Sequence, residues 1–204
     1  NIKEFRRAMQ IHAIPMFNTG YADKDGNIYY VYNAKIPIRD PRYDWSEFLP
    51  SESKSSLWYR YIPFNDLPQV LNPLDGFFQN CNSSPYLATG NRVDIQKVLP
   101  DWTGIEDHQT NRSLRSLETF GIQSSITQND FFDFKYDVEY SKESVMAYVR
   151  DKYIEDMKDN DQSTLEEALS LIKNWNLKAD SLNTSAALAL IVLPNAFKID
   201  DLKY

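Results

Sequence analysis

The chain has 204 residues, a formal net charge of −7 and a hydrophobic share of 42%. This length suits one domain or one large part of a domain, with enough apolar residues to form a core. The acidic balance argues against a nucleic-acid binder, because such proteins need a basic face to neutralise phosphates. The longest apolar run, Ala186–Leu193, is too short to cross a bilayer and indicates a buried helix.

The first part of the chain predicts a helix and then a hairpin. Ile2–Ala13 has apolar residues near helical spacing and is stopped by Pro15. Met16–Tyr21 and Ile28–Asn33 predict two strands joined by a polar turn. Ile36–Pro63 holds four prolines and several serines, so we expect a long irregular excursion anchored by its aromatic residues.

A second hairpin is predicted around Asp75-Gly76, because glycine accepts the positive φ that a tight turn demands. Gln69–Leu71 and Phe77-Phe78 are the strand-like stretches on either side. Asn80 and Asn82 would then point to the same face of the second strand. Two carboxamides at the end of a strand suit donors aimed at a developing negative charge. The alternative is an Asn-rich turn that satisfies its own backbone.

From about Ile105 the pattern becomes helical. The expected helices are Ile105–Phe120 with Gly121 as C-cap, Gln128–Tyr136 capped by Thr127 and Asp130, Lys142–Met157 opened by Ser141, Leu165–Leu177 opened by a capping box at Ser163–Glu166, and Asp180–Leu193. Residues 1–104 are therefore expected to hold a helix, hairpins and long loops, and residues 105–204 to be mainly helical. The predicted fold class is α+β.

Few residues could drive a reaction. There is no Gly-x-Ser-x-Gly motif, so a nucleophile elbow is absent. His12 and His108 lie in no motif, and we expect both to be structural. Cys81 has no adjacent cation or helix N-terminus, which argues against a nucleophile, and the single cysteine argues against zinc. The residues alone predict an amide-lined site without a nucleophile or a general base.

Several motifs resemble the penicillin acylase family. Asn18–Ile28 resembles its F-N-x-x-Y-A-D-x-x-G-N-I hairpin, and Ile36–Arg39 resembles the x-P-x-R that follows. Asn72–Pro85 matches N-P-x-x-G-x-x-Q-N-x-N-x-x-P. Looser similarities follow. Arg112 begins a segment that resembles the family's R-x-x-R, and Trp175–Asp180 with Ala186-Ala187 resemble its W-D-x-x-x-D-x-x-S-x-A-A. The resemblance spans nearly the whole chain and is most specific over residues 2–85.

The resemblance implies part of an N-terminal-nucleophile amide hydrolase with an αββα sandwich fold. In this family a precursor cuts itself and exposes an N-terminal Ser, whose own α-amine acts as the base. That Ser would lie outside this chain, which would be a piece of a β chain. The implied partners are the remaining segments of the α and β chains and a small-molecule amide, such as an antibiotic or a quorum signal. The implied location is the periplasm or the exterior.

The resemblance also implies roles for single residues. By their places in the motifs, Asn82 would be the oxyanion-hole residue and Arg112 the site arginine. For Arg112 and its neighbour Arg115, surface ion pairing is the alternative. No cofactor would be required, but some members bind a structural calcium, for which Pro41 and Asp94 would match two ligands. The other interpretation of the whole chain is a non-catalytic binding or folding module.

Overall fold

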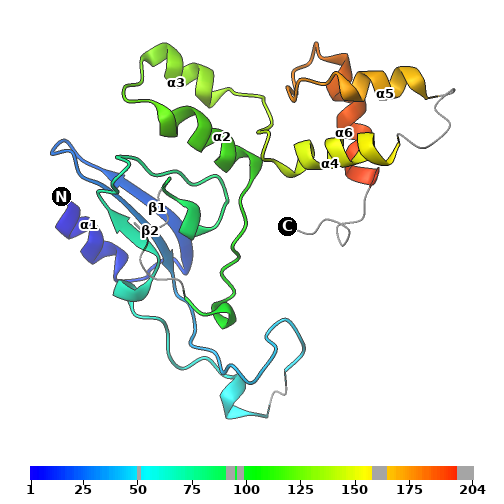
Figure 1. The fold of residues 1–204 in the computed structure, drawn as a ribbon. Helices are drawn as coiled ribbons and strands as arrows, with labels where there is room; N and C mark the ends of the chain where they lie inside the picture. The colour runs from blue at the N-terminus through cyan, green and yellow to red at the C-terminus, as the bar shows by residue number, and fades with distance from the viewer. Residues whose placement is uncertain (50–51, 91–94, 96–98, 158–164, 197–204) are drawn as a thin grey trace. The chain divides into compact units, whose positions relative to one another are not determined.

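The computed structural model describes residues 1–49, 52–90, 95, 99–157 and 165–196 (Figure 1). It divides into two compact units, Asn1–Gln109 and Thr110–Tyr204. The first unit holds α1 (Ile2–Met9), β1 (Met16–Ala22), β2 (Ile28–Ala34) and β3 (Gln69–Leu71). The second holds α2 (Asn111–Thr119), α3 (Gln128–Lys135), α4 (Val145–Asp156), α5 (Glu166–Lys173) and α6 (Thr184–Ala196). The α+β class is confirmed.

The sheet of the first unit is antiparallel, in the order β1-β2-β3. Each residue of β1 pairs with one of β2, from Met16 opposite Ala34 to Ala22 opposite Ile28, so the first predicted hairpin is confirmed. Its turn is closed by the Asp23 carboxylate, which accepts hydrogen bonds from backbone N–H groups of the turn. The alternating burial expected of an exposed sheet is missing in β2, where three successive residues are buried.

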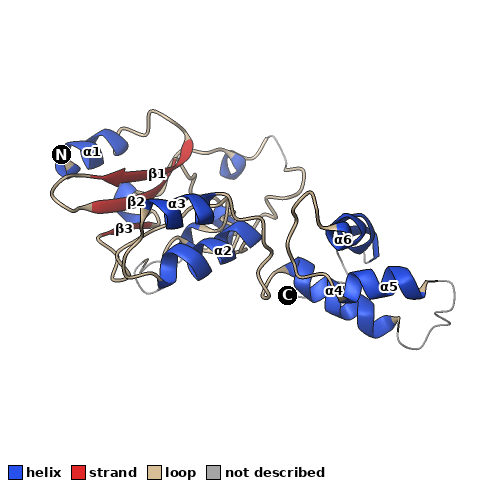
Figure 2. Ribbon diagram, turned by 90° about the horizontal axis from the view of Figure 1, so that it is seen from above, coloured by secondary structure: helices blue, strands red, loops and turns tan. Residues whose placement is uncertain are grey.

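β2 is covered on both of its faces. On one face Tyr29 and Val31 belong to a core cluster against which Phe5 of α1 packs. Figure 2 shows α1 beside the sheet. On the other face Tyr30 clusters with Val70 of β3 and with residues that follow the sheet in sequence. Tyr86, Ala88 and Ile95, with Phe78 and Ile105 packed against them, supply that second layer, so the predicted amide segment is built on the sheet.

The predicted second hairpin is wrong beyond its first strand. β3 pairs with β2, and Gly76 has φ +71 in a turn, but no strand follows that turn. The Gln79 backbone N–H donates instead to the Ala88 carbonyl at 2.7 Å, so the segment folds back on itself. Asn82 has φ +58, a left-handed conformation that no strand contains. The argument that two carboxamides share a strand face therefore fails.

The first predicted helix ends earlier than expected. The Asn1 side chain caps it by accepting from the backbone N–H groups of Lys3 and Glu4. α1 then stops at Met9, four residues before the predicted end, and His12 has φ +51. Ile2, Phe5 and Met9 of α1 are partly buried against the first core cluster, and Ile11, beyond the helix end, is exposed.

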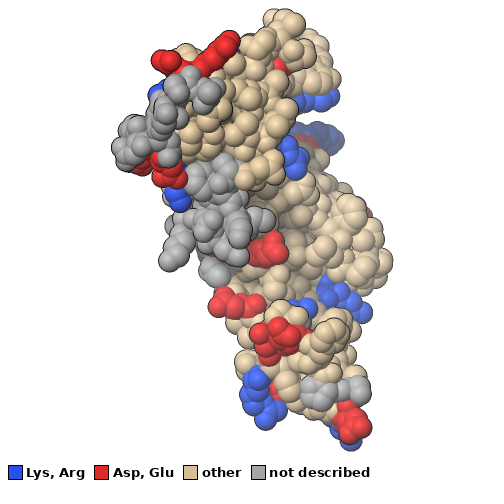
Figure 3. All heavy atoms as spheres, turned by 90° about the vertical axis from the view of Figure 1, so that its right-hand side faces the viewer, with Lys and Arg blue, Asp and Glu red and all other residues tan. Residues whose placement is uncertain are grey.

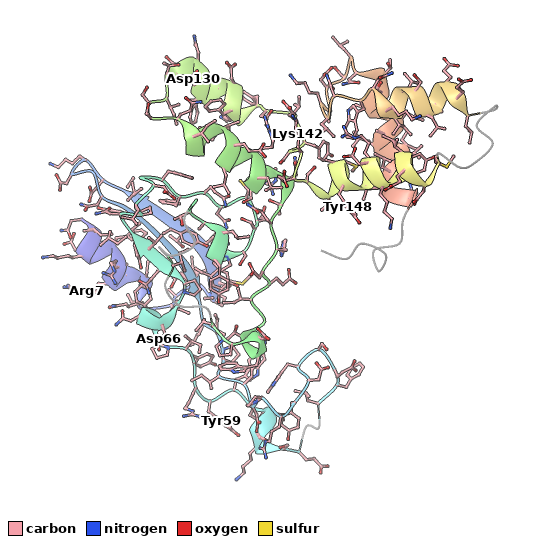
Figure 4. The ribbon with its side chains drawn as sticks, viewed as in Figure 1. Arg7, Tyr59, Asp66, Asp130, Lys142 and Tyr148 are labelled. Atoms are coloured by element: carbon pink, nitrogen blue, oxygen red, sulfur yellow. The ribbon has the colours of Figure 1, made fainter. Side chains whose placement is uncertain are left out.

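The excursion between β2 and β3 is irregular, as predicted, and its aromatic residues hold it. The Arg39 guanidinium lies 5.6 Å from the ring centres of both Trp45 and Trp58. Its Nη1 donates to the Trp102 carbonyl at 3.1 Å. A cation between two aromatic faces is an attractive contact. Tyr59, labelled in Figure 4, is carried on the same excursion and is exposed.

Capping residues set the helix boundaries in α2 and α3. α2 begins at Asn111 instead of Ile105, because the Thr110 hydroxyl accepts from the Ser113 N–H. Gly121 lies inside a single 3₁₀ turn, Phe120–Ile122, and is not the predicted C-cap. α3 and its capping box of Thr127 with Asp130 are confirmed (Figure 4).

The last three helices exist but are shifted. Ser144, not Ser141, caps α4, because its hydroxyl accepts from the Ala147 N–H. α5 ends at Lys173, and α6 begins at Thr184, where the Asn183 carbonyl oxygen of the side chain accepts from a first-turn N–H. Ser163 and Thr164 of the predicted capping box lie outside the described residues. The three helices enclose Trp175 in one apolar cluster.

Surface charge and the apolar character of the helices bear on nucleic-acid binding and on membrane insertion. On the face drawn in Figure 3, acidic and basic side chains of the described residues lie in small separate groups among uncharged ones. Within the described part of the chain, no helix has the length and apolar character needed to span a membrane.

Candidate active site

The motif carrying the predicted oxyanion residue forms a closed loop, residues 79–88. At its neck the Gln79 backbone N–H donates to the Ala88 carbonyl, and the side-chain Nε2 donates to the Leu87 carbonyl, each at 2.7 Å. The same Nε2 lies 3.3 Å from the Ser83 hydroxyl. Gln79 is buried, with 7% of its surface exposed, so these bonds are shielded from water.

The second half of this loop is fixed to the unit's interior. The Ser84 N–H donates to the His108 carbonyl at 3.0 Å, and the Ser84 hydroxyl caps a 3₁₀ turn that starts with Pro85. The Tyr86 hydroxyl accepts from the Leu99 N–H at 2.9 Å. Residues 83–89 are all buried. A Ser followed by Pro at the first turn position is a sequence signal for such a start.

Asn82 is exposed immediately before this buried segment. Its φ of +58 lies in the left-handed region, which asparagine tolerates better than most residues. A carboxamide offers two N–H donors. The fold therefore places a neutral hydrogen-bond donor at the surface of a loop that is anchored in the first unit.

Phe78, the residue just before the loop, packs on the sheet through an aromatic contact. The Phe78 ring lies 5.8 Å from the Tyr30 ring, and the Tyr30 hydroxyl donates to Asn18 Oδ1 at 2.6 Å. Burial raises the pKa of Tyr30, so this phenol stays protonated and structural. A Cβ on Gly20 would lie 2.8 Å from two atoms of the Phe78 ring. Gly20 is therefore the gap in β1 that admits Phe78.

Gly20→Ala should displace Phe78 and the loop that follows it. We expect the intact protein to lose about 1–3 kcal/mol of stability, the usual cost of overpacking. Its kcat should fall more than that of the neighbouring strand variant Thr19→Ala. Adding Phe78→Leu should restore part of kcat, because the smaller side chain relieves the clash. Steady-state kinetics and thermal unfolding measure both effects. Equal kcat values for Gly20→Ala and wild type would show that Phe78 does not control the loop.

The two arginines of α2 differ in their surroundings. Arg115 is half-buried, and its guanidinium donates to Asp137 at 2.6 Å and to Glu118 at 2.8 Å. The hydrogen bond that Arg115 donates to the Asp137 carboxylate is the main cause that raises the pKa of Arg115. Ion pairing is therefore the role of Arg115. Arg112 is exposed, and its role as a site arginine stays a prediction.

The described residues do not build the suggested calcium site. Pro41 is exposed, and the neighbouring Asp40 carboxylate is held by Arg42 at 2.6 Å. Hydrogen bonds from Arg42 lower the pKa of Asp40 to about 2. Asp94 lies outside the described residues. No group of three or more metal-ligating side chains occurs among the residues that the structure describes. The calcium expectation remains a prediction.

The two histidines have ordinary surroundings. His12 lies beside Phe64, with ring centres 5.9 Å apart, and burial is the main cause that lowers its pKa. His108 is exposed, 3.2 Å from Glu106, and its backbone carbonyl anchors the loop. These contacts agree with the structural roles expected for both.

Comparison with known proteins identifies the family. The penicillin amidase family model matches residues 1–198. The chain belongs to the penicillin amidase family. A penicillin G acylase of Escherichia coli is 38% identical over 68 residues, which is 33% of this chain and 8% of that protein. The aligned residues thus make up under a tenth of that acylase.

A solved penicillin amidase has a similar fold. The thermostable penicillin G acylase from Alcaligenes faecalis superimposes with a TM-score of 0.61 over 87% of this chain, at 22% identity. The match takes up 30% of that chain. It supports a piece of the penicillin acylase fold, as predicted. At the level of the family, the expected activity class is amide hydrolysis.

Sequence reasoning missed two residues that shape the candidate site. Gln79 appeared only as a letter of the motif, and Gly20 only as part of a strand. A glycine within a strand often marks a close approach of another group, which is the signal that could have pointed to the Phe78 contact. No sequence signal pairs Gln79 with Leu87, because that contact depends on the fold of the loop.

Proposed function

We propose that this chain is part of an acylase that hydrolyses a linear amide, and that Asn82 provides the oxyanion donor. The nucleophile is an N-terminal Ser supplied by polypeptide outside residues 1–204, exposed by self-cleavage of a precursor. Its hydroxyl oxygen attacks the amide carbon, and its α-amine takes the proton. The carbonyl oxygen becomes an oxyanion. When it collapses, the C–N bond breaks and the amine leaves with the proton that the α-amine had taken. Water then attacks the acyl-enzyme ester, which releases the carboxylic acid and restores the Ser hydroxyl.

One observation supports this role most: Asn82 is an exposed carboxamide in a left-handed conformation, directly before seven buried residues. The backbone strain of a non-glycine left-handed residue persists only where the surroundings hold it, and such residues gather at functional sites. A fixed N–H donor has little reorganisation to undergo when charge develops. The match covers only 30% of the solved penicillin G acylase chain, so a nucleophile can lie in a part of the protein outside residues 1–204.

Further features of the proposal follow the family. Arg112 is the candidate site arginine, and the remaining α and β segments complete the enzyme. The aromatic share of 14% favours an apolar or aromatic acyl group. A periplasmic or secreted location belongs to the same proposal.

Turnover of a chromogenic anilide of an aromatic acid tests the proposed function. We expect the intact, self-cleaved protein to release the aniline, and residues 1–204 alone to release none. Acylation by a Ser-directed inhibitor should label an N-terminal Ser outside residues 1–204. Hydrolysis by the isolated chain would contradict the placement of the nucleophile. If the intact protein shows no hydrolysis of any of a panel of amides, a non-catalytic binding module becomes the better account.

A further inference from the structure

The loop of residues 79–88 raises the question of what keeps Asn82 in place. The two segments that meet at its neck are not strands, so no ladder of backbone hydrogen bonds holds them. One backbone bond closes the neck, from the Gln79 N–H to the Ala88 carbonyl at 2.7 Å. The Gln79 side chain adds further hydrogen bonds across the loop, to the Leu87 carbonyl and the Ser83 hydroxyl.

That side chain reaches the far side of the loop. Its Nε2 donates to the Leu87 carbonyl at 2.7 Å and approaches the Ser83 hydroxyl at 3.3 Å. Ser83 follows Asn82 directly, so the bridge acts on the residue next to the donor. Both contacts are buried, where a lost hydrogen bond leaves a carbonyl unsatisfied and costs more than it would in water.

We infer that Gln79 is a positioning residue for Asn82. This inference rests on the proposed function, because it assigns Gln79 an effect on the reaction through the oxyanion donor. Its amide N–H bonds hold the two ends of the loop at a fixed separation. Asn82 then meets the developing oxyanion without first moving. A displacement of about 1 Å at a reacting group can cost on the order of a hundredfold in rate.

The chain offers a matched control in Gln69. That side chain also bridges to main-chain carbonyls, with Nε2 2.7 Å from the Phe64 carbonyl, and its Oε1 accepts from the Tyr29 hydroxyl. It lies on β3, outside the loop. Gln69→Met and Gln79→Met remove the same kind of bond and keep a similar side-chain length. Any loss due to packing alone should therefore appear in both.

The experiment uses the intact, self-cleaved protein and a chromogenic amide. Gln79→Met should lower kcat about tenfold or more with KM little changed. Gln69→Met should lower the melting temperature but keep kcat within about twofold of wild type. In an Asn82→Gly background, Gln79→Met should cause no further fall in kcat, because a residue that acts through Asn82 has nothing left to position.

A second variant covers the case in which Gln79→Met does not fold. Gln79→Glu keeps the shape, but its carboxylate repels the Leu87 carbonyl, whereas the protonated acid donates to it. Its kcat relative to wild type should rise as pH falls through the raised pKa of this buried carboxyl group.

The outcomes separate the two proposals. The positioning inference is overturned if Gln79→Met matches Gln69→Met in kcat, or if its effect is equally large without the Asn82 carboxamide. For Gln79→Glu, a flat pH profile relative to wild type overturns it as well. The proposed function of Asn82 itself fails if Asn82→Gly alone leaves kcat unchanged, and the positioning inference then fails with it.

Discussion

Trp175→Ala should destabilise the helical unit by about 3–5 kcal/mol, the range found when a large aromatic is removed from a core. Trp175 is 2% exposed and packs in the cluster formed by α4, α5 and α6. Its ring meets Tyr140 edge-on with centres 5.6 Å apart, and its Nε1 donates to the Lys178 carbonyl at 2.9 Å. Alanine would leave a cavity and remove one of the two side-chain hydrogen bonds that the Lys178 carbonyl accepts, since the bond from Asn183 remains.

Two variants separate the parts of this effect. Trp175→Phe keeps an aromatic ring but loses the N–H donor, so it should cost less than alanine. Trp58→Ala removes a tryptophan that is 52% exposed and should have a much smaller effect. Hydrogen exchange of the α5 and α6 amides measures the local stability directly. Similar protection in Trp175→Ala and Trp58→Ala would contradict the position of Trp175 at the centre of this core.

The sequence was most predictive where local signals agreed. The β1–β2 hairpin was predicted to within one residue at each strand end, because β-branched and aromatic residues flank a strong polar turn. The start of α3 was predicted because Thr127 and Asp130 form a reciprocal cap that depends on nothing else in the fold. Such signals act over three or four residues and can be recognised without tertiary structure.

Predictions failed where tertiary contacts decided the outcome. Phe77-Phe78 looked like a strand, but Phe78 packs against Tyr30 and the next residue bonds to the Ala88 carbonyl, nine positions along the chain. Periodicity also placed α4 too early, since both Ser141 and Ser144 are good caps. Ser141 instead donates its hydroxyl to the Glu118 carboxylate and its backbone N–H to Asn111 Oδ1. Neither outcome follows from spacing alone.

The local geometry of the candidate site residue differs from the prediction, and its role stays a prediction. The resemblance pointed to Asn82, and the structure places that residue at an exposed position. The strand face that was to display it does not exist. Asn82 is instead left-handed and lies next to a buried loop, which long-range contacts with His108 and Leu99 hold in place.

Asn82→Gly should lower kcat by about a hundredfold to a thousandfold, the usual loss when one oxyanion donor is removed. Glycine is the informative substitution, because it adopts the φ of +58 without strain and removes only the carboxamide. KM should change little if the bond forms only in the transition state. Asn82→Ala should show the same fall in kcat together with about 1–2 kcal/mol of added backbone strain.

Asn72 provides the matched control for this substitution. It is also a left-handed asparagine, with φ +49, and lies in the same motif. Its side-chain oxygen accepts from the Ile28 N–H at 2.9 Å, which ties β2 to the end of β3. Asn72→Gly therefore removes a structural hydrogen bond at an equally unusual backbone conformation. It should lower stability but leave kcat within about threefold of wild type.

The most direct measurement is the ratio of kcat values for wild type and Asn82→Gly in the intact protein, set beside the same ratio for Asn72→Gly. We predict a ratio of about a hundred or more at Asn82 and at most about three at Asn72. A ratio near one at Asn82, with the variant folded and the amide still hydrolysed, would contradict the oxyanion role on which the account depends.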